Sequence, residues 1–228
     1  MRKSLLMLTA LAMVFAIGCD HTHFGLHFGG NSGGKAIKGS GIALEEARSL
    51  PEFTDIELSG AYEVVVTCGE EQDVQISGDD NIVPLVKTEV IDKVLIVSTD
   101  ESISPEQKLT LTISAETIDS MNISGAVSAS ISHVDNQEFA IDLSGAGDLE
   151  MEGSVDDLQL LLSGAGSIDA EQLAAKTATV DVSGVGSVVL SASDELYATI
   201  SGLGDVEYCG DPQVIRKRVS GLGKIKKK

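Results

Sequence analysis

The sequence predicts an all-β fold, a β-solenoid whose coils each contain about 19 residues. A short string of an apolar residue, Ser and Gly recurs at an even spacing, and apolar and polar residues alternate on both sides of it. The chain has no Trp, 4% aromatic residues and 24 Gly. A core without large aromatic side chains must be built from Val, Ile, Leu and Ala, which suits thin, stacked β-layers.

The recurring string occurs six times, and its serines are separated by 20, 19, 20, 18 and 19 residues. Self-similarity at a fixed period is the sequence signature of a repeat architecture. We expect each Ser-Gly pair to form a corner between two strands, with Gly supplying the positive φ of a tight turn. The predicted structural corners are Ser124, Gly125, Ser144, Gly145, Ser163, Gly164, Ser183, Gly184, Ser201, Gly202, Ser220 and Gly221.

Apolar residues at alternate positions around each corner predict strands with one buried face. The residue before the corner Ser is apolar in all six copies. Coils stacked about 4.8 Å apart would align these residues in continuous ladders, with Leu162 buried between Leu143 and Val182. The alternative is an antiparallel β-sandwich, which leaves the fixed period unexplained.

The pattern is less regular between residues 50 and 120. The stretch from Ile56 to Val66 matches the repeat, whereas residues 74–78 begin like a corner and continue with acidic residues. We interpret 50–120 as irregular N-terminal coils that also cover the end of the solenoid, which would otherwise be an exposed sheet edge. The expected organisation is a flexible, Gly-rich tether over residues 19–40 and a solenoid domain over residues 41–228.

The first residues have the pattern of a signal peptide. Arg2 and Lys3 precede an uncharged apolar run that is shorter than the roughly 20 residues of a membrane-spanning helix. The run ends in Ala16-Ile17-Gly18-Cys19, which resembles the lipobox of bacterial lipoproteins. The resemblance implies that residues 1–18 are a lipoprotein signal peptide and that Cys19 carries the lipid. The alternative is an ordinary cleaved signal peptide followed by an incidental Cys.

The chain is strongly acidic, with 35 Asp and Glu against 16 Lys and Arg and a net charge of −19. Removal of residues 1–18 takes away two basic residues and no acidic one, so the expected mature chain carries −21. Such a chain repels phosphate groups, and nucleic-acid binding is not expected. The single basic cluster that we predict is the C-terminal one, Lys224, Lys226, Lys227 and Lys228, interpreted as a solvated tail that caps an edge.

No catalytic or cofactor-binding residue is predicted. Asp142 and Asp181 stand two residues before a corner Ser, and Asp148 and Asp205 stand four after one. None of them has Arg or His beside it in the repeat, as a polysaccharide-cleaving solenoid would need. We therefore interpret these carboxylates as solvated, outward positions of strands.

No metal site is predicted either. His21, His23 and His27 have a suitable spacing, but they lie in the expected tether without a cluster of carboxylate or thiol ligands. His133 is isolated in the sequence, so we expect a structural or exposed role for it.

The two remaining cysteines, Cys68 and Cys209, are expected to be free thiols. Their separation in sequence corresponds to about seven coils, or roughly 34 Å along a straight stack. A disulfide needs Cα atoms within about 7 Å of each other. The two residues therefore cannot pair in a linear solenoid.

The Ser-Gly-Ala-Gly repeats, the lipobox and the opening Arg48-x-Leu50-Pro51-x-Phe53-x-x-Ile56 together resemble one known family. It is the putative auto-transporter adhesin, head GIN domain family of bacterial envelope proteins, and the resemblance covers about residues 40–228. It implies a right-handed β-helix, in agreement with the repeat. It supplies no catalytic residues to carry over.

These observations predict a lipid-anchored binding or adhesion scaffold of the bacterial cell envelope, attached to the outer membrane or to a periplasmic face. The ligand is expected to be a surface glycan or a protein, and no cofactor is expected. One alternative is a carbohydrate-active β-helix enzyme, which would need a cleft with paired carboxylates. The other is a structural envelope protein with no diffusible ligand, which would need no binding patch.

Substitution of Cys19 tests the anchor. Cys19→Ser should abolish incorporation of a fatty-acid analogue, because the implied attachment atom is the sulfur of Cys19. Metabolic labelling measures the incorporation, and Cys209→Ser is the control that should keep the label. Undiminished labelling of the Cys19→Ser protein would contradict lipidation at this position.

Overall fold

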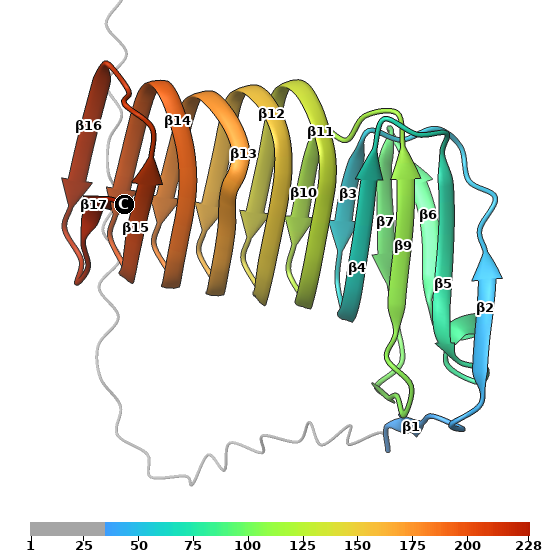
Figure 1. Cartoon of the computed structure of the whole chain (residues 1–228). Coiled ribbons are helices and arrows are strands. Elements are labelled where there is room, and N and C mark those ends of the chain that lie inside the picture. Colours follow the sequence, from blue (N-terminus) through green and yellow to red (C-terminus); the bar gives the residue numbers. More distant parts are fainter. Residues whose placement is uncertain (1–34) are drawn as a thin grey trace, which may run out of the picture. The chain divides into compact units, whose positions relative to one another are not determined.

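The computed structural model describes residues 35–228. The predictions for the signal peptide, for Cys19 and for the tether up to residue 34 fall outside the described residues. The described part is almost entirely β, with one short 3-10 helix, η1 (Val83–Leu85). Its strands stack side by side in a β-solenoid (Figure 1), which confirms the predicted fold class.

Four long strands form the regular part, and each bends near its middle so that its two halves lie on opposite sides of the coil (Figure 1). We call the side formed by segments that follow a corner face A, and the side formed by segments that precede a corner face B. The strands of the regular part are β10 (Ser120–Ile123), β11 (Ala126–Leu143), β12 (Ala146–Leu162), β13 (Ala165–Val182), β14 (Val185–Ile200), β15 (Leu203–Cys209), β16 (Val214–Val219) and β17 (Ile225–Lys227). The last long strand is β14. Its first half pairs with the short strand β15, and its second half pairs with the short strand β16.

The core lies between the two faces and consists of stacked apolar ladders. Equivalent residues of successive coils pair in parallel register, and Leu143, Leu162 and Val182 are consecutive members of one ladder. All three are fully buried, as the repeat predicts. Alternation of buried and exposed residues continues on both halves of each long strand, because successive side chains point to opposite sides of a strand.

The corners depend on close approach of successive coils. The N–H groups of Ser183 and Gly184 both donate to the carbonyl of Leu162, at 2.9 and 3.0 Å, and the other regular corners repeat this pattern. A Cβ atom on Gly184 would lie 1.9 Å from the carbonyl oxygen of Gly164 in the preceding coil. The expectation of a positive φ was wrong, since none of the six corner glycines has one. Glycine is required because no side chain fits between the stacked corners.

Two further coils precede the regular part, and their order in space differs from their order in the sequence. The strands β3 (Asp55–Leu58) and β4 (Ala61–Cys68) pair in parallel with β10 and β11. The next coil outward is formed by β7 (Val94–Ser98) and β9 (Thr110–Ala115), which come later in the sequence. The coil that is second from the N-terminal end in space therefore comes first in the sequence. Residues 69–93, which lie between the two coils in the sequence, close that end of the solenoid.

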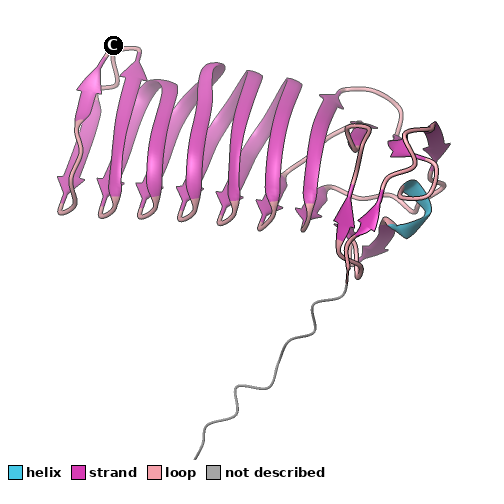
Figure 2. Cartoon of the chain, turned by 90° about the horizontal axis from the view of Figure 1, so that it is seen from below, coloured by secondary structure: helices cyan, strands magenta, loops and turns pink. Residues whose placement is uncertain are grey.

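That end is an antiparallel cap rather than a set of irregular coils. The strands β5 (Asp73–Asp79) and β6 (Lys87–Ile91) run antiparallel to β9 and β7, and β2 (Ala43–Ala47) runs antiparallel to β5. The corner-like Ser77-Gly78 lies inside β5, so the prediction of coils throughout 50–120 is corrected here. Figure 2 shows this cap, with its helix, at the opposite end of the row of corners from the C-terminus.

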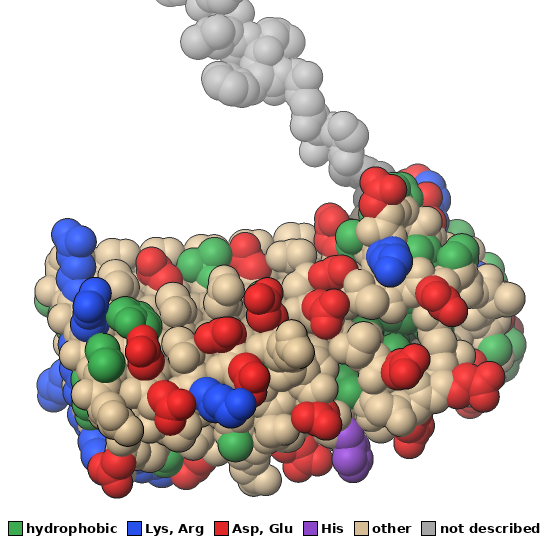
Figure 3. Space-filling view, turned by 90° about the horizontal axis from the view of Figure 1, so that it is seen from above, with side chains coloured by type: hydrophobic (Ala, Val, Ile, Leu, Met, Phe, Trp, Pro, Cys, Tyr) green, Lys and Arg blue, Asp and Glu red, His purple; other side chains and the backbone are tan. Residues whose placement is uncertain are grey.

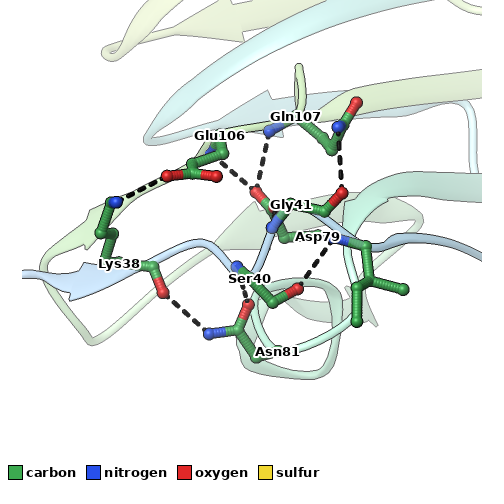
Figure 4. A network of polar contacts seen from close by, with 8 residues as sticks. Lys38, Ser40, Gly41, Asp79, Asn81, Glu106 and Gln107 are labelled. Atoms are coloured by element: carbon green, nitrogen blue, oxygen red, sulfur yellow. Dashed lines mark hydrogen bonds and ion pairs between the residues drawn. The ribbon is translucent and has the colours of Figure 1, made fainter.

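A buried carboxylate fastens the first described residues to the cap (Figure 4). Asp79 accepts hydrogen bonds from the backbone N–H groups of Gly41, Glu106 and Gln107, at 2.7 to 3.0 Å. Burial raises the pKa of this carboxyl, but the backbone donors outweigh burial and hold the pKa below its usual value. β1 (Ile37–Lys38) also pairs with β8 (Ile103–Ser104), so the folded part includes residues 37–40 of the expected tether.

The two cysteines are unpaired, as predicted. Cys68 ends β4 and Cys209 ends β15, and only five steps of strand pairing separate these strands. The expected seven coils were too many, because about fifty residues after Cys68 belong mainly to the cap and the outermost coil. Five steps still correspond to roughly 24 Å, far beyond disulfide reach.

Leu162 and its neighbour Leu161 provide a matched test of the register. Leu162 is 0% exposed and Leu161 is 38% exposed, although both belong to β12. Leu162→Ala should lower the free energy of unfolding by about 2–5 kcal/mol through a cavity. Leu161→Ala should change it by about 0.5 kcal/mol or less. Urea denaturation measures both, and equal effects would contradict the inward and outward assignment.

The thiols should react at different rates. Burial raises the pKa of the Cys68 thiol, and burial followed by the Glu171 carboxylate raises that of Cys209. Because Cys68 is buried and Cys209 half-buried, iodoacetamide should label Cys209 first, and both faster at higher pH. Mass spectrometry of the non-reduced, alkylated protein measures this, with the urea-unfolded protein as control. A Cys68–Cys209 disulfide would rule out the linear stack.

Candidate binding groove

Face B carries two columns of outward side chains, because the residues two and four positions before each corner point away from the core. Register pairing places equivalent residues of successive coils side by side. The column two before the corner is Glu57, Asn122, Asp142, Leu161, Asp181, Thr199 and Arg218. The column four before it is Asp55, Ser120, Ala140, Gln159, Thr179, Tyr197 and Arg216.

The middle of these columns is hollowed. One hollow of about 300 Å³ lies over β10 to β13. A second, of about 560 Å³, adjoins it toward the connection between β9 and β10, and the two share Ser120, Ala140 and Gln159. We call the two hollows together the face B groove. The first hollow is lined by Ser120, Asn122, Ala140, Ile141, Asp142, Gln159, Leu160, Leu161, Thr179 and Asp181.

An unpaired carboxylate oxygen lies in this groove. Oδ1 of Asp142 is buried, and no described residue donates a hydrogen bond to it. Its neighbours along the column are Asn122 and Leu161. A buried acceptor without a donor costs about 1–3 kcal/mol or more, so a native structure rarely keeps one without a use. Because Oδ1 is itself inaccessible to solvent, a donor from outside the protein can reach it only after the carboxylate turns.

The wider end of the groove is held by its own hydrogen bonds. Asn136 Nδ2 donates to the carbonyl of Ile118 at 2.6 Å, and Thr117 Oγ1 bonds to Oδ1 of Asn136 at 3.1 Å. The Ser120 hydroxyl donates to Asp55 of the preceding coil. These bonds fix the polar side chains before any ligand arrives, which lowers the entropic cost of binding.

Other polar groups of the groove column reach toward the C-terminal end. Asp142 and Asp181 lie two coils apart with Leu161 between them. The Tyr197 hydroxyl donates to Glu195, and the Arg216 guanidinium lies 5.4 Å from the centre of the Tyr197 ring. No Lys, Arg or His belongs to the lining of the 300 Å³ hollow.

The carboxylates predicted on face A do not form a site. Asp148 accepts a hydrogen bond from the Ser167 hydroxyl at 2.5 Å, and Asp205 accepts the N–H of Lys224 at 2.8 Å. Both bonds join adjacent coils and are structural. Within residues 35–228, no three His, Cys, Asp or Glu side chains come close enough together to hold a metal ion.

The predicted corner residues lie outside the groove, along the edge where face B turns into face A (Figure 2). At two of the early corners the Ser hydroxyl also bonds to a carbonyl of the preceding coil, namely Ser124 to Leu58 and Ser144 to Ile123, both at 3.3 Å. Their backbone N–H groups are used in the same way. These corners are structural, and they leave the outward columns free to vary.

Sequence reasoning missed both the groove and the full extent of one charged patch. The groove columns were visible as the polar residues two and four positions before each Ser, but those positions were interpreted only as solvated. The basic patch includes Arg216, Lys217 and Arg218 of β16 as well as the predicted lysines of the tail. Three consecutive basic residues were the available signal.

The His at position 133 occupies a special backbone position. His133 is exposed and has a φ of 59°, at the bend of β11 between its two halves. The next coil places Gly153, with a φ of 136°, beside Val134. The structural or exposed role expected for His133 agrees with its exposed position in the bend.

Parallel coils stacked in this way define the class of β-solenoid repeat proteins, whose stacked coils create extended surfaces. Residues 52–212 match the family described as "Putative auto-transporter adhesin, head GIN domain". The chain belongs to this family. No curated protein matches the chain. None of the described residues forms a helix long and apolar enough to cross a membrane.

Two solved structures share the fold. A putative adhesin from Bacteroides fragilis is 22% identical, with a TM-score of 0.69, and the alignment covers 85% of this chain and 100% of that one. A putative adhesin from Parabacteroides distasonis is 20% identical, with a TM-score of 0.51 and the same coverage of both chains. At these identities the likeness establishes the fold.

Proposed function

We propose that this protein is a lipid-anchored adhesion scaffold of the bacterial envelope that binds neutral glycan chains in the face B groove. Its family is described as adhesins, and the lipobox at Cys19 supports attachment to a membrane. The observation that carries the proposal is the unpaired Oδ1 of Asp142 in a preformed hollow whose lining combines a few polar groups with a larger apolar surface.

The side chains of the groove match the chemistry of a sugar. Asn122, Asp142, Gln159, Thr179 and Asp181 offer amide, hydroxyl and carboxylate groups that donate to and accept from hydroxyl groups. A sugar hydroxyl bound to the Asp142 carboxylate, turned so that Oδ1 becomes accessible, would satisfy the unpaired acceptor. Binding would then also remove the free-energy cost of the unpaired acceptor in the free protein.

One apolar side chain in the groove suits the hydrocarbon face of a sugar ring. Leu161 is partly exposed in the middle of the column, with Asp142 on one side and Asp181 on the other. An apolar centre flanked by polar groups can contact ring C–H groups and bond neighbouring hydroxyls at the same time.

The charge of the protein restricts the glycan. The expected mature chain carries −21, and the groove contains two carboxylates and no basic residue in its 300 Å³ hollow. Anionic polysaccharides and nucleic acids would be repelled. A neutral glycan avoids this repulsion, which favours it over acidic ones.

The groove suits binding better than catalysis. The distance between Asp142 and Asp181 nevertheless makes a glycan hydrolase the second candidate function. Asp142 and Asp181 lie two strands apart, which corresponds to about 9.6 Å between their Cα atoms. In inverting glycosidases the two carboxyl groups themselves lie about 6.5–9.5 Å apart. However, Leu161 lies between them and supplies no polar group to position the water molecule that an inverting mechanism needs. We therefore propose that the protein is not an enzyme.

Asp142→Asn tests the proposal. A glycan array followed by calorimetry with the best ligand should show binding by the wild type and about a 10-fold or greater loss of affinity in the variant, because a charged acceptor is lost. Asp157→Asn is the matched control, since Asp157 is exposed in the same strand, β12, and lines neither hollow. It should bind as the wild type does.

Three other outcomes would contradict the proposal. Absence of glycan binding would favour a structural envelope protein. Equal loss in Asp142→Asn and Asp157→Asn would place the binding outside the groove. Shortened glycans, detected by mass spectrometry with the wild type and absent with Asp142→Asn, would establish the hydrolase instead.

A further inference from the structure

The two ends of the solenoid differ in charge. Residues 212–228 contain seven Lys and Arg and no acidic residue, whereas residues 35–211 contain seven basic and 34 acidic residues. Figure 3 shows most of the visible Lys and Arg side chains at the C-terminal end, and mainly acidic charged side chains over the rest of that face. Lys226, Lys227 and Lys228 pair with acidic residues of their own chain, but Arg216 and Arg218 form no ion pair within the described residues.

The C-terminal end presents unpaired strand edges. β16 pairs only with β14, and β17 pairs only with β15. The N–H of Ser220 donates to the carbonyl of Ile200 at 2.8 Å, toward the preceding coil. Because successive residues of a strand direct their backbone groups to opposite sides, those of Lys217 and Val219 point away from the molecule. These groups can pair with another strand.

The same end leaves core positions uncovered. Ile215 is 43% exposed and Val219 is 45% exposed, although they continue the buried ladders of Leu196 and Ile200. Between them, Lys217 covers part of the core, with Nζ 3.0 Å from the Tyr208 hydroxyl and 4.4 Å from the ring centre. The last coil is therefore only partly closed.

The N-terminal end has matching edges on the same two faces. On face A the outermost strand is β2, and on face B it is β6, and each pairs on one side only. β2 carries Glu45 and Glu46, and β6 carries Glu89. Ile42 and Ile91 are exposed apolar residues at this end. Each end thus combines free strand edges with exposed apolar side chains, and the charges of β2 and of the C-terminal strands are opposite.

We propose that the protein associates head to tail with further copies of itself, the C-terminal end of one copy docking on the N-terminal cap of the next. With the faces aligned, basic β17 meets acidic β2 and β16 meets β6. The exposed apolar residues of the two ends come into contact in the same step. This inference goes beyond the proposed function and does not depend on the groove.

The alternative contact between copies is disfavoured by charge. Tail-to-tail pairing would set the Arg216-Lys217-Arg218 run of one copy against the same run of its partner. Like charges directly opposite each other destabilise strand pairs, and basic residues on an edge prevent such pairing. The head-to-tail contact joins two different surfaces, the C-terminal end of one copy and the N-terminal cap of the next. Such a heterologous contact does not close into a ring, so it generates linear oligomers rather than a dimer.

The contact is expected to be weak and sensitive to salt, because it joins the narrow ends of a solenoid through exposed charges. Sedimentation velocity of the full chain should show the weight-average mass rising at least about twofold between about 10 µM and 1 mM at low salt. The rise should shrink as salt increases. A wild type that stays monomeric throughout this range, or that stops at a dimer, would overturn the proposal.

Charge reversal at each end provides the decisive variants. One variant is Lys224→Glu with Lys226→Glu at the C-terminal end, and the other is Glu45→Lys with Glu46→Lys at the N-terminal end. Each alone should associate more weakly than the wild type, because the reversed charges remove the attraction between β17 of one copy and β2 of the next. An equimolar mixture should associate again, since the ends of the two variants are complementary.

The mixture also separates a lost contact from a lost fold. If each variant melts as the wild type does and their mixture stays monomeric, the head-to-tail contact is disproved. Lys176→Glu, a reversal in the middle of the solenoid, is the matched control and should associate like the wild type. Asp142→Asn should also associate normally, so failure of this proposal and failure of the glycan proposal are distinguishable.

Discussion

The structure depends on one constraint, the close parallel stacking of one coil on the next. At each regular corner the Ser and Gly N–H groups share a carbonyl of the preceding coil, and a Cβ on the Gly would lie about 2 Å from backbone oxygen. A corner that tight fixes the register on both faces, because strands that leave it in step remain in step. Apolar residues of one coil then lie against apolar residues of the next, and the core consists mainly of aliphatic side chains with a few aromatic ones such as Phe139.

The same stacking also arranges the outward side chains of face B into a regular surface. Since register is set at the corners and in the core, side chains two and four positions before each Ser are free to differ, yet they lie in columns about 4.8 Å apart. In the face B groove these columns bring together Asn122, Asp142 and Asp181 from three coils. The scaffold holds them without mobile loops, which suits recognition of an extended ligand by a rigid surface.

The regular stacking stops at the two ends of the solenoid, and the two ends have different structures. The N-terminal end is closed by antiparallel strands and by the buried carboxylate of Asp79, whereas the C-terminal end finishes in a basic, partly open coil. An uncovered sheet edge invites another strand, and its charge decides which strand is accepted. The contrast between the two ends underlies the inferred head-to-tail contact.

The sequence by itself determined the regular part of this protein. The Ser-Gly period, the alternation around it and the absence of Trp were sufficient to predict the solenoid, the burial of Leu162 between Leu143 and Val182, and the free state of Cys68 and Cys209. These features are local and repeated, so each copy of the string reports the same geometry. The role of the corner glycines was misjudged because their constraint comes from the neighbouring coil and not from their own turn.

Only the tertiary structure decided the cap, the groove and the two ends. The outermost coil is made by β7 and β9 after β3 and β4 have formed the next one, an order that no local pattern encodes. The orphan oxygen of Asp142 depends on what the adjacent coils place beside it. The partial opening of the C-terminal coil depends on which strand comes last. Each of these is set by contacts between residues distant in sequence, and a repeat pattern carries no information about where repetition ends.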